Sequence, residues 1–113
     1  MSVKQLTING TSWMEFRDVL ASLTPFRTYG NLSGITGRAL DAGRMPQPHR
    51  SEYYDRSEHI DYTVLSYGTP IAWHDNERGW VMPDTKYSTT TSKAQGRIAP
   101  GIAALNTEAV AAR

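Results

Sequence analysis

The sequence predicts an α+β fold, with a small, mainly antiparallel sheet packed against an N-terminal amphipathic helix and a second helix following the last strand. The N-terminal part of the chain carries a helix-capping signal and apolar residues at helical spacing. Strand-forming Tyr, Trp, Val, Ile and Thr concentrate in residues 62–93, and the hydroxyl run at 88–92, followed by lysine, is typical of a helix start. A chain of 113 residues is expected to form a single domain over 1–113.

The first expected element is a short edge strand or ordered arm. Leu6 and Ile8 alternate with polar neighbours ahead of Asn9 and Gly10. Because an exposed edge strand in a small sheet can pair with another chain, a homodimer through an edge strand is expected.

A helix is expected from residue 13 to about Thr24. Ser12 and Glu15 have the spacing of a capping box, in which each side chain satisfies a backbone donor of the first turn. Pro25 disfavours helical geometry in the residue before it, so the helix must end there. Its core face is expected to comprise Trp13, Phe16, Leu20 and Leu23.

The middle of the chain is predicted to be irregular. Residues 26–43 contain glycines that break any regular helix, which predicts turns and one short strand. Residues 44–58 combine prolines with mixed charge, which predicts a long polar surface loop that either contacts a partner or is mobile. The candidate protein-binding residues of this loop are Arg50, Tyr53, Tyr54 and Arg56.

Strands are expected at 61–67 and 71–74, with a return strand at 80–82 after a hairpin loop at 75–79. The Gly68-Thr69-Pro70 junction is either a turn or a bulge within one long strand. Trp73 and Trp80 are expected to face each other across the hairpin. A last short strand is expected at Lys86-Tyr87.

The second helix is expected to run from the hydroxyl run toward Ile98. Pro100 and Gly101 then stop or kink it, and the tail from about residue 100 has a thin apolar face, which predicts a frayed terminal helix.

Composition excludes several classes of protein. There is no cysteine, so disulfides, thiolate nucleophiles and Cys-rich zinc sites are excluded. No leader-like segment and no apolar run of membrane-spanning length occurs, which predicts a cytoplasmic protein with no membrane contact. The net charge is only +1, but residues 61–84 carry one basic and four acidic side chains, while residues 85–113 carry four basic and one acidic. This asymmetry is either complementary surface charge or an anion-binding face.

Two sequence blocks, SYGTPIAWHD and KYSTTTSKAQGRI, carry a resemblance. They resemble a family of small uncharacterised proteins of tailed bacteriophages and plasmids, whose blocks run approximately SYxTxIA and YSxTTSKHQ. The resemblance implies a phage or plasmid accessory protein in an infected bacterial host, and it implies no activity. Ala94 stands where that pattern has His. The matching residues are Ser66, Tyr67, Thr69, Ile71 and Ala72 in the first block, and Tyr87, Ser88, Thr90, Thr91, Ser92, Lys93 and Gln95 in the second.

The best candidate site is the expected helix start, where hydroxyls, backbone N–H groups and basic side chains suit a phosphate. The alternative is that one hydroxyl caps the helix and the others bond internally. Tyr67 and Tyr87 are expected to pack as cross-strand neighbours, with base stacking as the alternative. The candidate nucleic-acid-binding residues are Ser88, Thr90, Thr91, Ser92, Lys93 and Arg97.

No catalytic or metal motif is present. His74-Asp75 resembles an oriented imidazole but has no accompanying nucleophile motif, and the three histidines lack metal-type spacing. We therefore expect a non-enzymatic protein without cofactor that contacts nucleic-acid phosphates. The alternative is a host-protein-binding module that uses the 44–58 loop.

Overall fold

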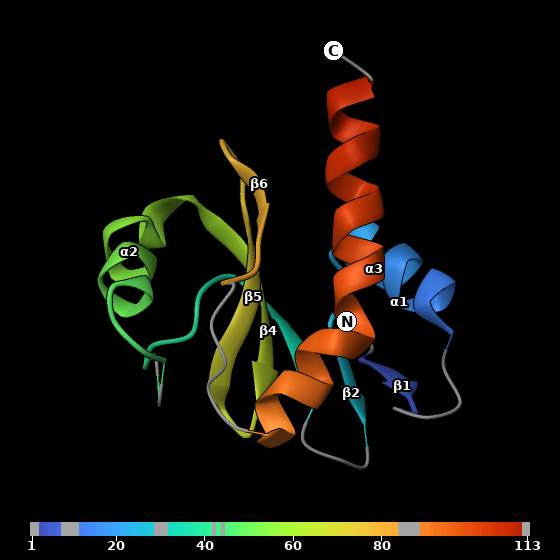
Figure 1. Ribbon diagram of the computed structural model, residues 1–113, viewed down its shortest axis with the longest axis horizontal. Coiled ribbons are helices and arrows are strands. Elements are labelled where there is room, and N and C mark those ends of the chain that lie inside the picture. The colour runs from blue at the N-terminus through green and yellow to red at the C-terminus, as the bar shows by residue number, and fades with distance from the viewer. Residues whose placement is uncertain are drawn as a thin grey trace.

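The computed structural model describes residues 3–7, 12–28, 32–41, 43, 45–83 and 89–111, and within these it describes no side chain for residues 13, 89–93 and 108–111. The fold is α+β, as the sequence predicts (Figure 1). The elements in chain order are β1 (Lys4–Leu6), α1 (Trp13–Ala21), β2 (Phe26–Thr28), β3 (Leu32–Thr36), α2 (His49–Asp55), a 3-10 turn η1 (Ser57–His59), β4 (Ile60–Ser66), β5 (Thr69–Asp75), β6 (Gly79–Val81) and α3 (Thr89–Ala111).

The six strands form one sheet in the order β1-β2-β3-β4-β5-β6. β1 is parallel to β2, and every other neighbouring pair is antiparallel. Helices α1 and α3 lie on one side of the sheet and α2 on the other (Figure 1). The main core therefore lies between the sheet and α1 with α3, and a smaller second core lies under α2.

Helix α1 begins and ends as its local sequence requires. The backbone N–H of Glu15 donates to the Ser12 hydroxyl at 3.2 Å, which confirms the predicted N-cap. At the other end the N–H of Leu23 donates to the Leu20 carbonyl at 3.0 Å and the N–H of Thr24 to the Val19 carbonyl at 3.1 Å, with Leu23 at φ 51. This is a Schellman motif, so the helix ends slightly before Thr24.

The expectation of a long surface loop at 44–58 is wrong. Residues 49–55 form α2, and the side chains of Met45 and Tyr53 are fully buried. The Tyr53 hydroxyl accepts from the N–H of Ala39 at 2.6 Å and lies 2.8 Å from the Thr63 hydroxyl. Met45 and Tyr53 anchor this polar segment, because they pack against an apolar face of the sheet.

The β4–β5 hairpin closes through a tight turn. Tyr67 and Gly68, both at positive φ (51 and 80), connect β4 to β5, so the reading of one long bulged strand is wrong. An irregularity does occur one step later, because Leu65 pairs with Pro70 while Val64 pairs with Ala72. The extra residue in β5 is Ile71.

In the β5–β6 hairpin the side chains of the two tryptophans lie on opposite faces of the sheet. The loop that joins β5 and β6 lies where it was predicted, but Trp73 pairs with Val81 and Trp80 with His74. Since neighbouring residues of a strand point to opposite faces, Trp73 enters the second core and Trp80 the main core. The expected contact of the two indoles across the hairpin is therefore wrong.

Helix α3 continues through Pro100 to Ala111, so Pro100 does not end it. Its axis changes direction partway along (Figure 1), as a proline inside a helix produces. The second half is held by packing, since Ile102 is buried in the main core and Gly101 lies against the backbone of Arg17 on α1. Of the two expected effects of Pro100, the structure has the kink and not the stop, and the expected fraying of the tail stays a prediction.

Candidate nucleic-acid interface

The predicted phosphate site lies at the start of α3. The helix begins at Thr89, inside the hydroxyl run, as predicted. Arg97 is exposed about two turns along the helix. The predicted strand at residues 86–87 and Ser88 lie outside the described residues, and the structure describes no side chains for Thr90, Thr91, Ser92 and Lys93.

The first half of α3 is fixed to the sheet. Ala94 and Ile98 are buried beside Ile71 in the main core. The Gln95 amide donates to the carbonyl oxygens of Ile71 at 3.5 Å and Pro83 at 3.4 Å. Ala94, which replaces the His of the resembling pattern, is therefore a core residue here, and the helix start is held by packing around it.

Helix α3 runs in the same direction as β5. Gln95 bonds to Ile71 near the start of β5, whereas Asn106 bonds to Trp80, which pairs with His74 near the end of β5. The start of α3 therefore lies at the end of the sheet where the β4–β5 turn is. Two segments distant in sequence, the hydroxyl-rich helix start and this turn, share one end of the molecule.

Tyr67 occupies that turn, and its side chain is 76% exposed. The expectation that it packs in the core is wrong, because its position in the turn carries the ring beyond the last strand pair. Tyr87, its expected partner, lies outside the described residues. A left-handed conformation at a bulky residue costs about 1–3 kcal/mol, so the chain holds this aromatic ring in solvent against a local strain.

The protein-binding residues predicted in segment 44–58 are largely engaged within the fold. Tyr53 is fully buried, and its burial raises the pKa of its hydroxyl. Arg50 donates to the Met45 carbonyl at 3.1 Å. Tyr54 is the exposed member of the set. The predicted four-residue contact surface is therefore wrong for Tyr53.

Arg56 also belongs to the fold. Its guanidinium donates to both carboxylate oxygens of the buried Asp75, at 2.8 and 2.9 Å, and to Glu77 at 2.9 Å. Asp75 further accepts the backbone N–H groups of Glu77 at 2.8 Å and Arg78 at 3.0 Å. The hydrogen bonds from Arg56, more than the backbone donors, hold the pKa of Asp75 well below its ordinary value. This network ties α2 to the β5–β6 hairpin.

His74 is oriented by a carboxylate, but that carboxylate belongs to Asp61 on the neighbouring strand and not to the adjacent Asp75. Nδ1 of His74 lies 2.6 Å from Oδ1 of Asp61, and the ring packs at 5.2 Å from that of Trp80. Within the described part of the chain no hydroxyl bonds to this imidazole. A carboxylate thus orients the ring, but the arrangement lacks the nucleophile of a catalytic triad.

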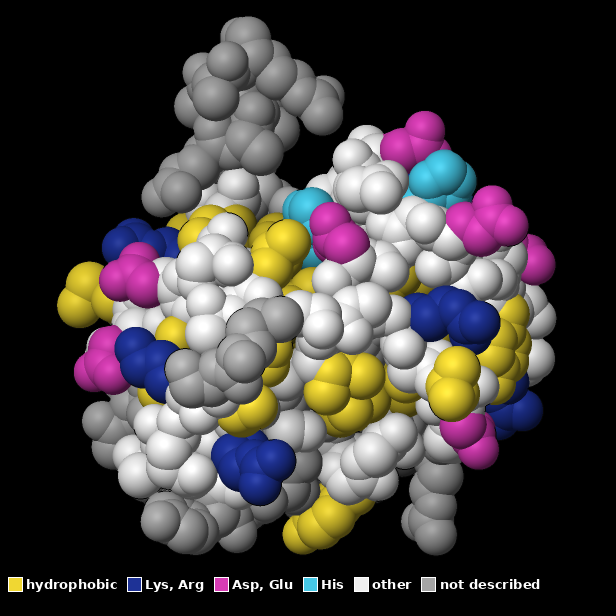
Figure 2. All heavy atoms as spheres, turned by 180° about the vertical axis from the view of Figure 1, so that it is seen from behind, with side chains coloured by type: hydrophobic (Ala, Val, Ile, Leu, Met, Phe, Trp, Pro, Cys, Tyr) yellow, Lys and Arg dark blue, Asp and Glu magenta, His cyan; other side chains and the backbone are white. Residues whose placement is uncertain are grey.

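Charge is unevenly distributed over the described surface. Several exposed carboxylates lie on α2, η1 and the β5–β6 hairpin, and others lie on α1 and at Asp41. Figure 2 shows a group of acidic side chains at the upper right edge of the molecule and others at the left and lower right. The exposed cations of the described residues are Lys4 on β1, Arg27 on β2, Arg38 after β3, Arg78 in the β5–β6 loop and Arg97 on the first half of α3. Among the described residues α2 and η1 carry exposed carboxylates without an exposed Lys or Arg, so a polyanion is least favoured there.

The described residues contain no cluster of three or more His, Cys, Asp or Glu side chains that could hold a metal ion. No helix among the described residues has the length and apolar character needed to cross a bilayer.

A family model described as a family of unknown function (DUF8033) matches residues 1–104. No curated protein and no solved structure matches the chain.

Proposed function

The chain belongs to this DUF8033 family of unknown function, and from the arrangement of its own residues we propose that it is a non-enzymatic protein that binds single-stranded nucleic acid. The observation that supports this most is the exposed ring of Tyr67, held at the end of the sheet where the hydroxyl-rich α3 begins. An aromatic platform next to an anion-attracting helix end is the combination that single-strand binding uses.

Each part has a physical role in this proposal. The ring of Tyr67 stacks on a base, which requires that the base be unpaired and splayed from its neighbours. The α3 start and its basic side chains neutralise phosphates and release condensed counterions. The proposed phosphate-contacting residues are Ser88, Thr90, Thr91, Ser92, Lys93 and Arg97.

The setting follows from the resemblance of the two sequence blocks. We propose an accessory protein of a bacteriophage or plasmid that acts in the cytoplasm of its bacterial host. Nucleic acid in single-stranded form arises there during replication and transcription, so a small binding module has an available ligand.

Fluorescence anisotropy of labelled single- and double-stranded DNA and RNA tests the proposal, at low and at moderate salt. Saturable binding to single strands is expected, with log K falling by about 0.7 per neutralised phosphate for each tenfold rise in salt. Lys93→Glu combined with Arg97→Glu should abolish it. Tyr67→Ala should weaken it about 5- to 150-fold, which corresponds to about 1–3 kcal/mol for one stacked base.

Two control variants separate these effects from general damage. Tyr54→Ala removes an exposed tyrosine on the α2 side, and Arg78→Glu reverses an exposed charge at the opposite end of the sheet; both should bind as the unaltered protein does. If neither DNA nor RNA binds in either form, the proposal fails. The alternative, a host-protein-binding module that acts through the α2 side, would then be preferred.

A further inference from the structure

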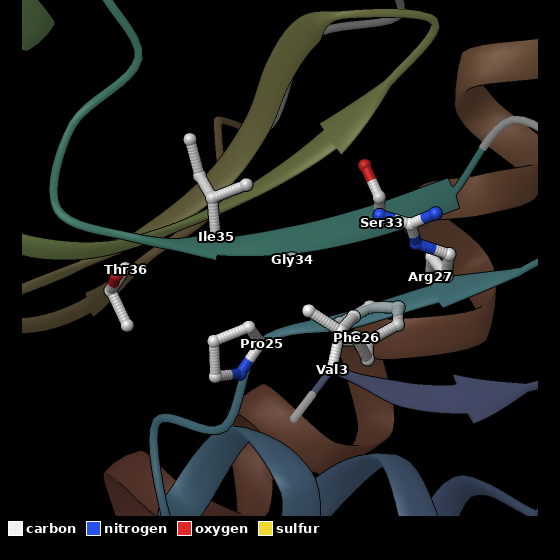
Figure 3. Close-up of a pocket in the computed structure, with 8 residues that line it drawn as sticks. All are labelled: Val3, Pro25, Phe26, Arg27, Ser33, Gly34, Ile35 and Thr36. Atoms are coloured by element: carbon white, nitrogen blue, oxygen red, sulfur yellow. The ribbon is translucent and has the colours of Figure 1, made fainter. Parts of the chain in front are cut away.

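A depression lies over β2 and β3 near the β1 edge of the sheet (Figure 3). Its volume is about 420 Å³, which is within the range of about 300–1,000 Å³ typical of small-ligand sites. Its walls include the apolar side chains of Val3, Pro25 and Ile35 and the polar side chains of Arg27 and Ser33. A depression with apolar walls and a cation on its rim suits a flat ring that carries an anionic group.

Arg27 is available to such a ligand. Its side chain is exposed, and none of the residues that the structure describes forms a hydrogen bond or ion pair with it. In Figure 3 its guanidinium lies beside Ser33, and Ser33 and Ile35 project from the same side of β3. A guanidinium offers several donors in a planar fork that matches the oxygens of a phosphate.

The strand register connects this depression with Tyr67. Arg27 pairs with Ser33 and Ser33 with Leu65, so these three residues form one row across β2, β3 and β4. Leu65 is two residues before Tyr67 in the chain. With strands about 4.8 Å apart, Arg27 lies about 10 Å from Leu65 across the sheet. The path from the exposed ring to the depression is only a few nucleotides long.

The face along this path is partly exposed. Ser33 and Leu65 are partly exposed, and Gln5, which pairs with Arg27 on the outer side, is exposed. The second core, which α2 covers, has Tyr53 and Trp73 at its centre and reaches this row only at its margin, through Leu65. A strand that leaves Tyr67 can therefore cross the sheet at Leu65 and Ser33.

We infer that the depression binds one nucleotide of the strand that is held at Tyr67, with the base between the apolar walls and its phosphate at Arg27. This inference rests on the proposed function, because Tyr67 supplies the other end of the path. Its ligand is a nucleotide within an oligonucleotide. The site adds length-dependent affinity, since only a strand long enough to reach from the turn to β2 fills both positions.

A length series of single-stranded oligonucleotides, from a dinucleotide upward, tests the inference by anisotropy. The unaltered protein should gain affinity in a step at the length that reaches the depression. Arg27→Ala should remove the step, lowering affinity for long strands by about tenfold or more, as expected for a lost charged hydrogen bond, while leaving short strands unaffected. Arg27→Lys, which keeps the charge, should restore part of it.

Matched measurements keep the two proposals separable. Arg78→Ala removes another exposed arginine, at the other end of the sheet, and should leave the step intact. Amide NMR shifts of Ser33 and Ile35 on addition of a long strand should disappear in Arg27→Ala, whose melting temperature should be unchanged. If strands bind through Tyr67 but Arg27→Ala behaves like Arg78→Ala at every length, the inference is wrong and the proposed function stands. If no strand binds, both fail.

Discussion

The side-chain amide of Asn106 on α3 forms two hydrogen bonds with the backbone of Trp80 on β6. The N–H of Trp80 donates to Oδ1 of Asn106 at 3.1 Å, and Nδ2 of Asn106 donates to the Trp80 carbonyl at 3.0 Å. β6 is an edge strand, so this amide occupies the position that a further strand would take. One side chain thus protects a sheet edge and fixes the second half of α3.

Asn106→Ala should lower the free energy of unfolding by about 1–3 kcal/mol, because two hydrogen bonds are lost at a partly buried site. The exposed edge should also increase self-association. Urea unfolding and light scattering over a range of concentrations measure the two effects. Thr107→Ala, an exposed change on the same helix, is the control. If the two variants have equal stability and mass, the protective role of Asn106 is wrong.

A homodimer through strand pairing remains a prediction. Because Asn106 occupies the β6 edge of the sheet, we expect such a dimer to form through the other edge, β1. β1 has only three residues, and its Lys4 is exposed. Light scattering of the unaltered protein decides whether a dimer forms. If β1 provides the interface, Asn106→Ala should produce larger species by opening the second edge; a monomer at high concentration would contradict the prediction.

Tyr53→Phe should destabilise the fold by about 1–3 kcal/mol although it removes a single oxygen. That oxygen accepts from the Ala39 N–H and bonds to the Thr63 hydroxyl in a fully buried place, and the Thr63 hydroxyl itself donates to the Gly37 carbonyl. Its loss therefore leaves the buried Ala39 N–H without an acceptor and the Thr63 oxygen with one bond fewer. Thermal and urea unfolding measure the change. Tyr54→Phe alters the exposed neighbour and should have almost no effect; equal effects for the two would refute the burial argument.

The Arg56–Asp75 pair predicts a dependence of stability on pH. Because the folded pKa of Asp75 is below its ordinary value of 3.8, the pair stabilises the fold above that pH. The stabilisation is lost progressively as the pH falls below 3.8 toward the lower folded pKa. Asp75→Asn should therefore differ most from the unaltered protein at neutral pH, and the difference should shrink in acid. Glu77→Gln, at an exposed member of the network, should shift the profile less. Unfolding titrations at a series of pH values provide the test.

Two glycine-to-alanine substitutions should change the free energy of unfolding in opposite directions. A Cβ at Gly34 would clash with the Tyr62 hydroxyl and lie 2.5 Å from the Phe26 ring, so Gly34→Ala should cost about 1–3 kcal/mol or more. At Gly96, inside α3, no atom of the described residues lies within 4 Å of that position, and Gly96→Ala should stabilise the fold by about 1 kcal/mol. Parallel urea curves distinguish them, and a shift in the same direction for both would contradict the packing at β3.

The elements that carried a local signal were predictable. Ser12 and Glu15 predict the start of α1 and Pro25 limits how far it can extend, and the strands β4 to β6 follow from β-branched and aromatic residues. α2 was missed because its polar composition carries no periodic apolar face. Only the sheet, assembled from residues distant in sequence, makes burial of Tyr53 favourable.

The candidate site was predictable only in part. The helix start at the hydroxyl run follows from propensity, but the exposure of Tyr67 depends on where the β4–β5 turn closes. Arg27 and Ser33 were not singled out, because short strands between glycines give little signal and their pairing is a matter of register. The continuation of α3 through Pro100 likewise depends on tertiary contacts, those of Gly101 and Ile102.

The turn at Tyr67 implies a trade-off between local stability and display of the ring. Asn or Gly adopts the left-handed conformation with less strain than tyrosine does. The chain nevertheless has tyrosine at this left-handed position. Tyr67→Asn should therefore make the protein more stable while it weakens nucleic-acid binding, which thermal unfolding and anisotropy would measure in one variant. A loss of both would mean that the ring supports the fold; a gain in stability with a loss of binding would mean that the chain keeps a less stable turn for the sake of its ligand.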